Sequence, residues 1–208
     1  LNGTLTNLTA STYLGGTGDD QYIQSIAIDS EGNIYVAGFT SSSDFPTTTG
    51  AYDTSYGGRG DAFVSKLNAD LSSLIASTYL GGSDADNAYS IAMDSSGNIY
   101  LGGYTWSSTF PTSTGAYNTS YGGYGDAFIS KLNGELTNLL ASTYLGGSSY
   151  DYGYSIAINS SGSIYISGYT SSSDFPTTVD AYQNNYKTHS ETFVSKFDSN
   201  LSGPPPSG

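Results

Sequence analysis

The chain has 208 residues, 14% of them aromatic and 11% charged, and this length is enough to bury one sizeable hydrophobic core. Five Lys and Arg residues against 18 Asp and Glu give a net charge of −13, which argues against nucleic acid and anionic membrane surfaces as partners. The absence of cysteine excludes disulfides, thiolate catalysis and cysteine-bound zinc. No apolar run approaches the roughly 18 residues of a membrane-spanning helix, so we expect no insertion into a bilayer.

The hexapeptide STYLGG occurs at 11–16, 77–82 and 142–147 and begins a repeat that runs through the chain. The three copies cover residues 11–76, 77–141 and 142–203. One run reads SIAIDSEGNIYVAGFT in the first copy, SIAMDSSGNIYLGGYT in the second and SIAINSSGSIYISGYT in the third. Self-similarity at a fixed period indicates units that pack on one another. Residues 1–203 are therefore expected to form a single repeat domain, followed by a Pro-rich tail at 204–208.

In the first copy, alternating apolar and polar residues predict strands at 25–29 and 33–40, joined by a DSEG turn in which Gly32 can adopt a positive φ. After a long loop, further strands are expected at 62–67 and 74–80. No segment shows the 3.6-residue apolar spacing of a helix. The sequence thus predicts an all-β fold of repeated sheets with four antiparallel strands, as in the blades of a β-propeller.

Four runs of the second copy carry a resemblance to a known family. DSSGNIYLGGYT, FPTSTGAYNTSYGG, GDAFISKLN and LLASTYLGG resemble the bacterial and archaeal β-propeller repeat called SBBP, and all three copies share the pattern. The resemblance implies propeller blades. Because proteins with this repeat are typically large and secreted or surface-attached, it also implies an extracellular or cell-surface location.

The two ends of the chain each resemble part of a blade. The N-terminal LNGTLTNLTASTYLGG matches the turn and fourth strand of later copies, while FVSKFDSNLSGPPPSG has prolines where the last copy should have its fourth strand. Because proline cannot donate to a β-ladder, we predict one blade split between the ends, completed in cis or in trans by a strand within 1–16. The residues predicted to form this assembly strand and the edge that receives it are Leu8, Thr12, Tyr13, Leu14, Phe193 and Val194.

Three arrangements would satisfy such a split blade. Two chains could exchange strands and close a six-bladed ring, or each chain could donate its strand onward to build an open fibre. A tight three-bladed ring, or a segment of a longer array, is the third alternative. In each case the protein is its own principal partner, since natural proteins avoid exposing an unpaired strand edge.

Catalytic machinery is not indicated. The only histidine, His189, lies in a loop without the nucleophile and orienting group that a catalytic base needs. Asp61, Asp126 and Glu191 recur once per copy, which is more typical of a structural cap at the start of the third strand than of paired glycosidase carboxylates. We expect no enzymatic activity and no catalytic residue.

No cofactor is expected, although calcium is a candidate. Calcium takes six to eight oxygen ligands, and the loops after the double glycines contain closely spaced acids in the first two copies. The alternative is that these acids are solvated loop residues, because the third copy keeps only Asp151. The candidate ligands are Asp19, Asp20, Asp84, Asp86 and Asn87.

Aromatic residues crowd the long loops and suggest a binding surface for glycans or surface proteins, since aromatic faces with polar edges suit such contacts. The alternative is packing between blades, which recurring tyrosines would serve. Trp106, Tyr124 and His189 depart from the repeat and are the better candidates for a specific role. The candidate ligand-binding residues are Tyr56, Trp106, Tyr121, Tyr124 and Tyr186.

The composition and repeats favour a non-catalytic extracellular scaffold that self-assembles through its split blade, as a surface, fibre or adhesive module. A carbohydrate- or protein-binding propeller, stabilised by calcium, is the alternative. Export through a glycosylating pathway would add glycans at Asn-x-Ser/Thr motifs. Those motifs begin at Asn2, Asn7, Asn118, Asn159 and Asn200.

Overall fold

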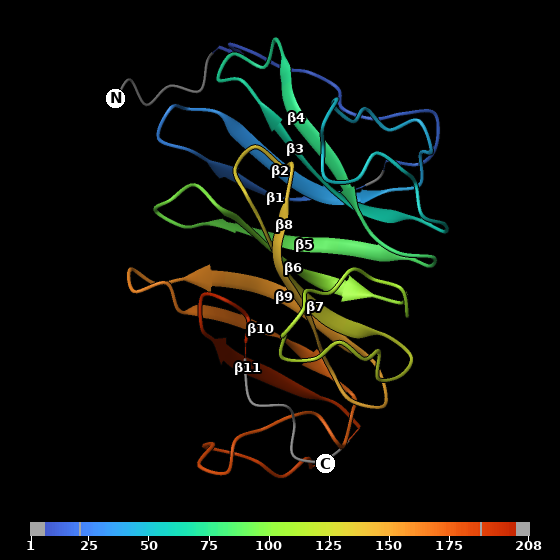
Figure 1. Cartoon of the computed structure of the whole chain (residues 1–208), viewed down its shortest axis with the longest axis vertical. Coiled ribbons are helices and arrows are strands. Elements are labelled where there is room, and N and C mark those ends of the chain that lie inside the picture. Colours follow the sequence, from blue (N-terminus) through green and yellow to red (C-terminus); the bar gives the residue numbers. More distant parts are fainter. Residues whose placement is uncertain (1–6, 21, 188, 203–208) are drawn as a thin grey trace.

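A computed structural model describes residues 7–20, 22–187 and 189–202 and consists of three antiparallel sheets (Figure 1). The first sheet has the strand order β1-β2-β3-β4, the second β5-β6-β7-β8 and the third β11-β10-β9. The predicted all-β fold, with four antiparallel strands in each complete unit, is confirmed. Within the described ranges, no helix is long and apolar enough to cross a membrane.

The strands fall close to the positions expected from sequence. In the first copy the bounds are β1 (Tyr22–Ile28), β2 (Ile34–Thr40), β3 (Asp61–Leu67) and β4 (Leu74–Leu80). The second copy has β5 (Asp86–Met93), β6 (Ile99–Thr105), β7 (Asp126–Leu132) and β8 (Leu139–Leu145). The third has β9 (Asp151–Ile158), β10 (Ile164–Thr170) and β11 (Glu191–Phe197). We refer to the three sheets as the first, second and third blade.

Local chemistry accounts for the hairpins between the first two strands of each blade. In the first blade, Asp29 Oδ1 accepts the backbone N–H groups of Glu31 and Asn33, at 3.0 and 2.8 Å, and Gly32 has a φ of +85°. An L side chain rarely adopts this φ, so glycine fits the turn. Asp94 and Asn159 accept equivalent bonds in the other blades. These turns are side-chain-capped hairpins, as the sequence indicated.

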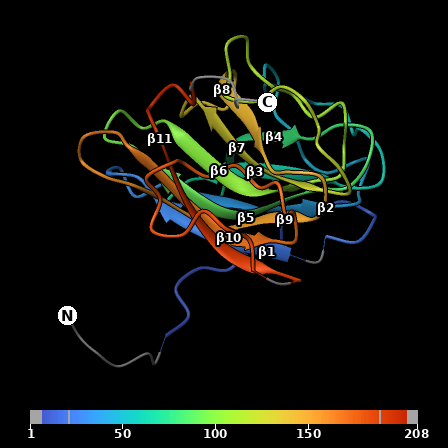
Figure 2. The ribbon, with the colours of Figure 1, turned by 90° about the horizontal axis from the view of Figure 1, so that it is seen from below.

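The blades stack in chain order, with the second between the first and third (Figure 1), and the sheets overlap when the molecule is seen from below (Figure 2). Their first strands β1, β5 and β9 are neighbours across the stack. The hydrophobic core lies between blades: Val64 on β3 packs in one cluster with Ile91 and Leu101 of the second blade, and Ile129 on β7 packs with Ile156 of the third. Each sheet therefore buries one face against the next, as propeller blades do.

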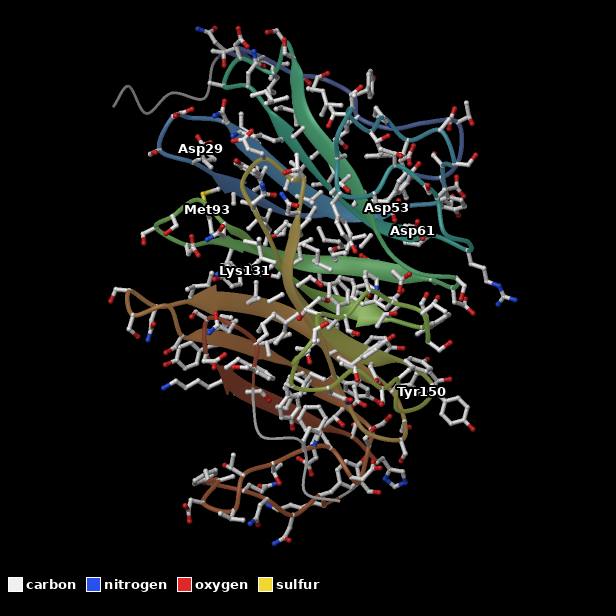
Figure 3. The ribbon with its side chains drawn as sticks, in the orientation of Figure 1. Asp29, Asp53, Asp61, Met93, Lys131 and Tyr150 are labelled. Atoms are coloured by element: carbon white, nitrogen blue, oxygen red, sulfur yellow. The ribbon has the colours of Figure 1, made fainter. Side chains whose placement is uncertain are left out.

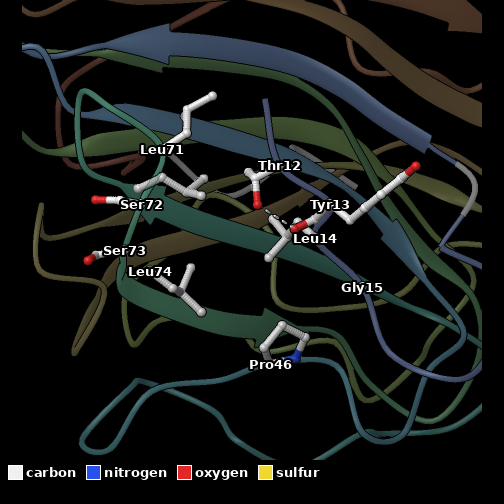
Figure 4. A pocket seen from close by; sticks show the side chains of 10 residues that line it. Thr12, Tyr13, Leu14, Gly15, Pro46, Leu71, Ser72, Ser73 and Leu74 are labelled. Carbon is white, nitrogen blue, oxygen red and sulfur yellow. Dashed lines mark hydrogen bonds between the residues drawn. The ribbon is translucent and has the colours of Figure 1, made fainter. Parts of the chain in front are cut away.

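The stack is open rather than closed on itself. β4 and β11 lie at opposite ends of the molecule in Figure 1, so the three-bladed ring considered from sequence is not formed. Residues 7–16 form no strand; residues 12–15 instead line a shallow hollow with Pro46, Leu67 and the β3–β4 turn of the first blade (Figure 4). In this single chain, the third blade is not completed in cis. The Pro-rich tail at 204–208 lies outside the described residues.

Candidate functional site

The tyrosine of STYLGG has contrasting environments in the three copies. Tyr79 and Tyr144 are each 1% exposed, in the fourth strands of the first and second blades. The Tyr79 hydroxyl donates to the Ser42 carbonyl at 2.7 Å and accepts the Phe45 N–H at 3.1 Å. Tyr13 is fully exposed, at 102%. The first copy of the strand therefore displays in solvent the side chain that its equivalents bury.

Strand β11 has the edge that such a fourth strand would occupy. Within the described ranges β11 pairs only with β10, whereas β3 and β7 pair with strands on both sides. Phe45 and Phe110 are each 3% exposed beneath the fourth-strand tyrosine, but the equivalent Phe175 is only half-buried. The edge of β11 and the exposed Tyr13 correspond to two halves of one blade.

The outer faces of the stack are also apolar and exposed. On β1, Ile26 is 62% exposed, whereas its equivalents Ile91 and Ile156 are 7% and 6% exposed. On β11, Val194 is 77% exposed, whereas Ile129 at the same position of β7 is completely buried. The outer face of β1 and the outer face of β11 thus carry the opposite sides of the interface that joins neighbouring blades.

A hydrogen bond links the first strands of neighbouring blades at both internal junctions. Ser25 Oγ accepts the Ile91 N–H at 3.2 Å, and Ser90 Oγ accepts the Ile156 N–H at 3.1 Å. The third serine of this series, Ser155, is exposed on the outer face of β9. The chain therefore has an exposed serine of this series on β9 at one end of the stack. At the other end lies β1, the equivalent of the strands β5 and β9 that donate to these serines.

Four buried carboxylates, which we call the junction aspartates, occupy the loop side of the two junctions; they are Asp61, Asp86, Asp126 and Asp151, each no more than 1% exposed. Figure 3 shows Asp61 where the first and second blades meet. Asp61 Oδ2 accepts the Gly57 N–H at 2.7 Å, and Asp86 Oδ2 accepts the Gly82 N–H at 2.7 Å and the Ser107 hydroxyl at 2.9 Å. Asp126 and Asp151 accept the matching bonds at the second junction.

The absence of a side chain on glycine lets these carboxylates approach each other across each junction. A Cβ on Gly81 would lie 2.7 Å from Asp61 Oδ1 and 2.8 Å from Asp86 Oδ2, both far too close for a real contact. On Gly146 it would meet Asp126 Oδ1 at 2.7 Å and Asp151 Oδ2 at 2.8 Å. Glycine is thus required at positions 81 and 146 because two carboxylates of successive blades lie against it there.

The electrostatics of the junction aspartates follow from this burial. Burial raises the pKa of Asp61 to about 6, above its usual range. Burial, with the nearby charge of Asp61, raises the pKa of Asp86 to about 7. The pKa of Asp126 is raised to about 7 by burial and by Asp151, whose own pKa is raised by burial. Ionised carboxylates at these positions are therefore costly unless a positive charge accompanies them.

A second feature is an open hollow of about 290 Å³ lined by Tyr150, Tyr152, Tyr154 and Tyr169. Along β9 and the loop before it, the rings of Tyr150, Tyr152 and Tyr154 stack at 6.3 Å intervals with interplanar angles of 12° and 13°. Tyr169 stacks on Tyr152 at 6.0 Å. Tyr150 is 41% exposed and Tyr154 52% exposed, so the hollow offers accessible aromatic faces.

The aromatic residues predicted as ligand-binding lie in two different settings. Tyr56 and Tyr121 pack on the buried Tyr79 and Tyr144 at 6.0 and 5.9 Å. Trp106 and Tyr124, which depart from the repeat, are 41% and 68% exposed and contact the tyrosine cluster through Tyr104 and Tyr150. Tyr186 is half-buried in the long loop of the third blade. The structure brings Trp106 and Tyr124 toward one surface and uses Tyr56 and Tyr121 in packing.

The acids predicted as calcium ligands are dispersed. Asp84 lies 3.8 Å from exposed Arg59 in an ion pair, while Asp86 is buried at the first junction and Asn87 is 6% exposed. Asp20 Oδ2 accepts the Gly16 N–H at 2.6 Å, and Asp19 is exposed. No group of three or more His, Cys, Asp or Glu side chains suited to a metal occurs in the described part of the chain. These residues remain predictions as ligands.

The remaining predicted positions are mostly at the surface. Asn7, Asn159 and Asn200 are exposed, Asn118 is half-buried, and Asn2 lies outside the described residues. His189 is exposed in its loop. Sequence reasoning treated Asp61 and Asp126 as strand caps and missed that each faces an aspartate of the next blade. Their recurrence before every third strand, together with the recurring acid after each double glycine, was the available signal.

Antiparallel sheets that stack through apolar faces, with their first strands adjacent, are blades, and they define this chain as a β-propeller-type repeat protein. The family model SBBP, "Beta-propeller repeat", matches residues 11–46, 77–111 and 142–176, about half of the chain. The chain belongs to the SBBP β-propeller repeat family, as its sequence indicated. A search of curated proteins gives no match.

Proposed function

We propose that the protein is a non-catalytic scaffold that self-assembles by donating the strand at 8–14 of one copy to β11 of another. The observation that carries this proposal is the exposure of Tyr13, whose equivalents Tyr79 and Tyr144 are buried and hydrogen-bonded in complete blades. Strand donation satisfies an exposed β-edge and lends main-chain hydrogen bonds to the assembly. The exposed faces with Ile26 and Val194 support the same contact, because they match faces already joined inside the chain.

The internal blades fix the register that a donated strand would adopt. Ser65 pairs with Ser77 and Ser130 with Ser142, and in each pair the hydroxyls are 2.7–2.8 Å apart. By the repeat, Ser195 of β11 would face Ser11 of the donated strand, and Phe193 would face Tyr13. The same register serves a closed pair of chains or an open fibre, which differ only in whether the rotation between copies closes.

Cysteine cross-linking tests this register, because the natural chain has no cysteine. In the variant carrying Ser11→Cys and Ser195→Cys, mild oxidation should link one copy to another, since directly opposed residues of antiparallel strands suit a disulfide. The matched control carries Ser11→Cys and Ser130→Cys, because Ser130 already faces Ser142. Linked species from the first variant alone support strand donation. Equal cross-linking in both variants, or none in either, contradicts it.

Light scattering and negative-stain microscopy of the unmodified chain distinguish the assemblies. Discrete rings of twice the chain mass would show reciprocal exchange, and filaments would show onward donation. A strictly monomeric chain at high concentration would overturn the proposal of self-assembly. Dissociation after deletion of residues 1–16 would assign the contact to the donated segment.

The proposal includes an extracellular or cell-surface location. The Lys-poor composition supports it, as does the surface attachment that the resemblance of the sequence implies. Fractionation of producing cells, with detection by an antibody, tests the location. Detection only in the cytosolic fraction would contradict it.

The tyrosine hollow favours a second candidate function, the binding of a neutral carbohydrate. Flat sugar faces stack on aromatic rings, and the phenol hydroxyls can bind sugar hydroxyls. Trp106, the only tryptophan, lies 5.7 Å from Tyr104, which contacts Tyr152 at 4.9 Å, so its fluorescence should report ligand in the hollow. Titration with neutral oligosaccharides should change this signal in the natural chain and not after Tyr154→Ala. Tyr182→Ala, at a fully exposed loop tyrosine, is the control. No response to any oligosaccharide would remove this candidate.

A further inference from the structure

Both internal junctions hold buried negative charge without a partner in the described part of the chain. Oδ1 of Asp61 and Oδ1 of Asp126 are buried and have no hydrogen-bond partner. The ion pairs among the described residues involve Asp29, Asp84 and Asp94, so none of them neutralises a junction aspartate. An uncompensated buried charge costs several kcal/mol, a cost that either a bound cation or a proton would relieve.

The unpartnered oxygen of Asp61 lies close to other oxygens of the first junction. Across Gly81, Asp61 Oδ1 faces Asp86 Oδ2, because both lie within 2.8 Å of the place a Cβ would take. The Gly82 carbonyl oxygen is on the same side: a Cβ on Gly57 would lie 2.1 Å from it and 3.3 Å from Asp61 Oδ1. Two carboxylate oxygens and one carbonyl oxygen are therefore near one another at the first junction, packed closely against Gly57 and Gly81.

The second junction repeats this arrangement with different residues. A Cβ on Gly122 would lie 2.3 Å from the Gly147 carbonyl oxygen and 3.4 Å from Asp126 Oδ1. Across Gly146, Asp126 Oδ1 faces Asp151 Oδ2. Because the repeat places the same residue types at both junctions, the same set of oxygens recurs at each of them.

We propose that each internal junction binds one calcium ion, held by Asp61, Asp86 and the Gly82 carbonyl at the first junction and by Asp126, Asp151 and the Gly147 carbonyl at the second. Calcium takes six to eight carboxylate, carbonyl and water oxygens in flexible geometry, so water would supply the ligands beyond the two carboxylates and the carbonyl. The net charge of −13 favours cation uptake. The site differs from the set of ligands predicted from sequence, since it shares only Asp86 with that set.

The expected number is two ions per chain, whether or not copies assemble. In the third blade Glu191 replaces the junction aspartate, and Lys187 occupies the position of Gly57 and Gly122. The Lys187 N–H donates to Glu191 Oε1 at 3.1 Å. A side chain at position 187 prevents the close approach that the double glycine makes in the other blades, so no third site of this kind is expected.

The first experiment measures calcium binding by the full chain after removal of metal with EDTA. Isothermal titration with CaCl₂ at pH 7.5 should give two sites per chain, and native mass spectrometry should detect the same number of ions. Calcium at about 100 times the Kd should raise the Tm by roughly 5–10 °C for each site that binds only the folded state. MgCl₂ should be weaker, because Mg²⁺ demands a regular octahedron and sheds water reluctantly.

Single variants assign the ions to the junctions. Asp61→Asn should reduce the number of bound ions from two to one, and Asp126→Asn should do the same at the other junction. Asparagine keeps an oxygen that can accept the Gly57 or Gly122 N–H, so the loop contact is retained. Asp84→Asn, at the half-buried acid paired with Arg59, is the matched control and should keep both ions.

The outcomes distinguish a calcium ion at each junction from an ion held by the loop acids and from a proton shared between carboxylates. Absence of calcium binding and of any rise in Tm for the natural chain, which requires no variant to fold, would overturn the proposal. If Asp84→Asn abolishes binding while Asp61→Asn and Asp126→Asn keep it, the ion belongs to the loop acids around Asp84, and the junction site is wrong. If Asp61→Asn raises the Tm at pH 7.5 and calcium has no effect on the natural chain, the carboxylates share a proton instead.

Discussion

The STYLGG tyrosine is expected to stabilise the complete blades and, in the first copy, to be available for binding another chain. Removal of its hydroxyl at equivalent positions tests this difference. In Tyr79→Phe the ring remains, but the Ser42 carbonyl loses its donor and the Phe45 N–H loses its acceptor. Both groups are buried, so the change leaves two unsatisfied polar groups in the interior. In Tyr13→Phe the lost hydroxyl is in solvent.

The magnitude follows from the cost of buried unsatisfied groups. Leaving such a group without a partner costs about 1–3 kcal/mol, so we expect Tyr79→Phe to lower the free energy of unfolding by about 2 kcal/mol. For a chain of this size, that loss corresponds to a fall in Tm of roughly 4–8 °C. Tyr144→Phe should behave alike, because its hydroxyl donates to the Ser107 carbonyl at 2.8 Å. Tyr13→Phe should change the monomer by less than about 0.5 kcal/mol.

Urea unfolding and calorimetry at a protein concentration low enough to keep chains apart supply the measurement. The same variants at high concentration read the assembly: Tyr13→Phe should weaken association about fivefold, the equivalent of ~1 kcal/mol for one hydrogen bond to the partner. The reasoning is refuted if Tyr79→Phe is as stable as the natural chain. It is refuted equally if Tyr13→Phe destabilises the monomer as much as Tyr79→Phe does.

Three further outcomes are expected. Gly103→Ala should unfold or severely destabilise the chain, because a Cβ there would lie 1.9 Å from the Asn87 carbonyl oxygen; Gly102→Ala, with ordinary contacts of 3.4 Å, should be tolerated in the same melting experiment. Val194→Asp should block assembly while shifting monomer stability by less than about 0.5 kcal/mol, as sedimentation and thermal melts would show. In EDTA, the Tm should rise as the pH falls from 8 to about 5. The reason is that the junction aspartates, with folded pKa values of about 6–7, take up protons that the unfolded chain does not bind in this range. A flat Tm across that range would contradict the raised pKa values.

The fold was predictable because each repeat gives an independent reading of the same unit. Strands expected at 62–67 and 74–80 correspond to β3 (Asp61–Leu67) and β4 (Leu74–Leu80), and the asparagine- and aspartate-capped turns agree as well. Comparison of the copies also identifies the glycines that a close backbone contact requires. Gly103 has glycine in both other copies, at Gly38 and Gly168, because a carbonyl approaches at that point of each bulged strand pair.

The site was harder to predict because alignment of copies identifies equivalent residues and not neighbouring ones. Asp61 aligns with Asp126, yet in space it faces Asp86, which belongs to a different position of the next copy. That contact depends on the rotation and offset between successive blades, which packing of side chains such as Val64 determines. Similarly, the tyrosines at 150, 152 and 154 form one stacked row only because β9 alternates its side chains along the sheet.

The third blade differs from the others at the loop side of its outer face, and this difference constrains what an assembly can be. At the internal junctions two contacts act together, the apolar faces of the strands and the close approach of a glycine loop to the next double glycine. Lys187 and Glu191 remove the second contact from the terminal face, while the apolar surface around Val194 and the open edge of β11 keep the first. In the proposed assembly, a junction between copies therefore depends on strand donation and apolar burial alone. It also lacks the covalent tether that gives internal blades a high effective concentration. Contacts between copies should consequently be weaker than contacts between blades, so that assembly responds to protein concentration while each chain remains folded.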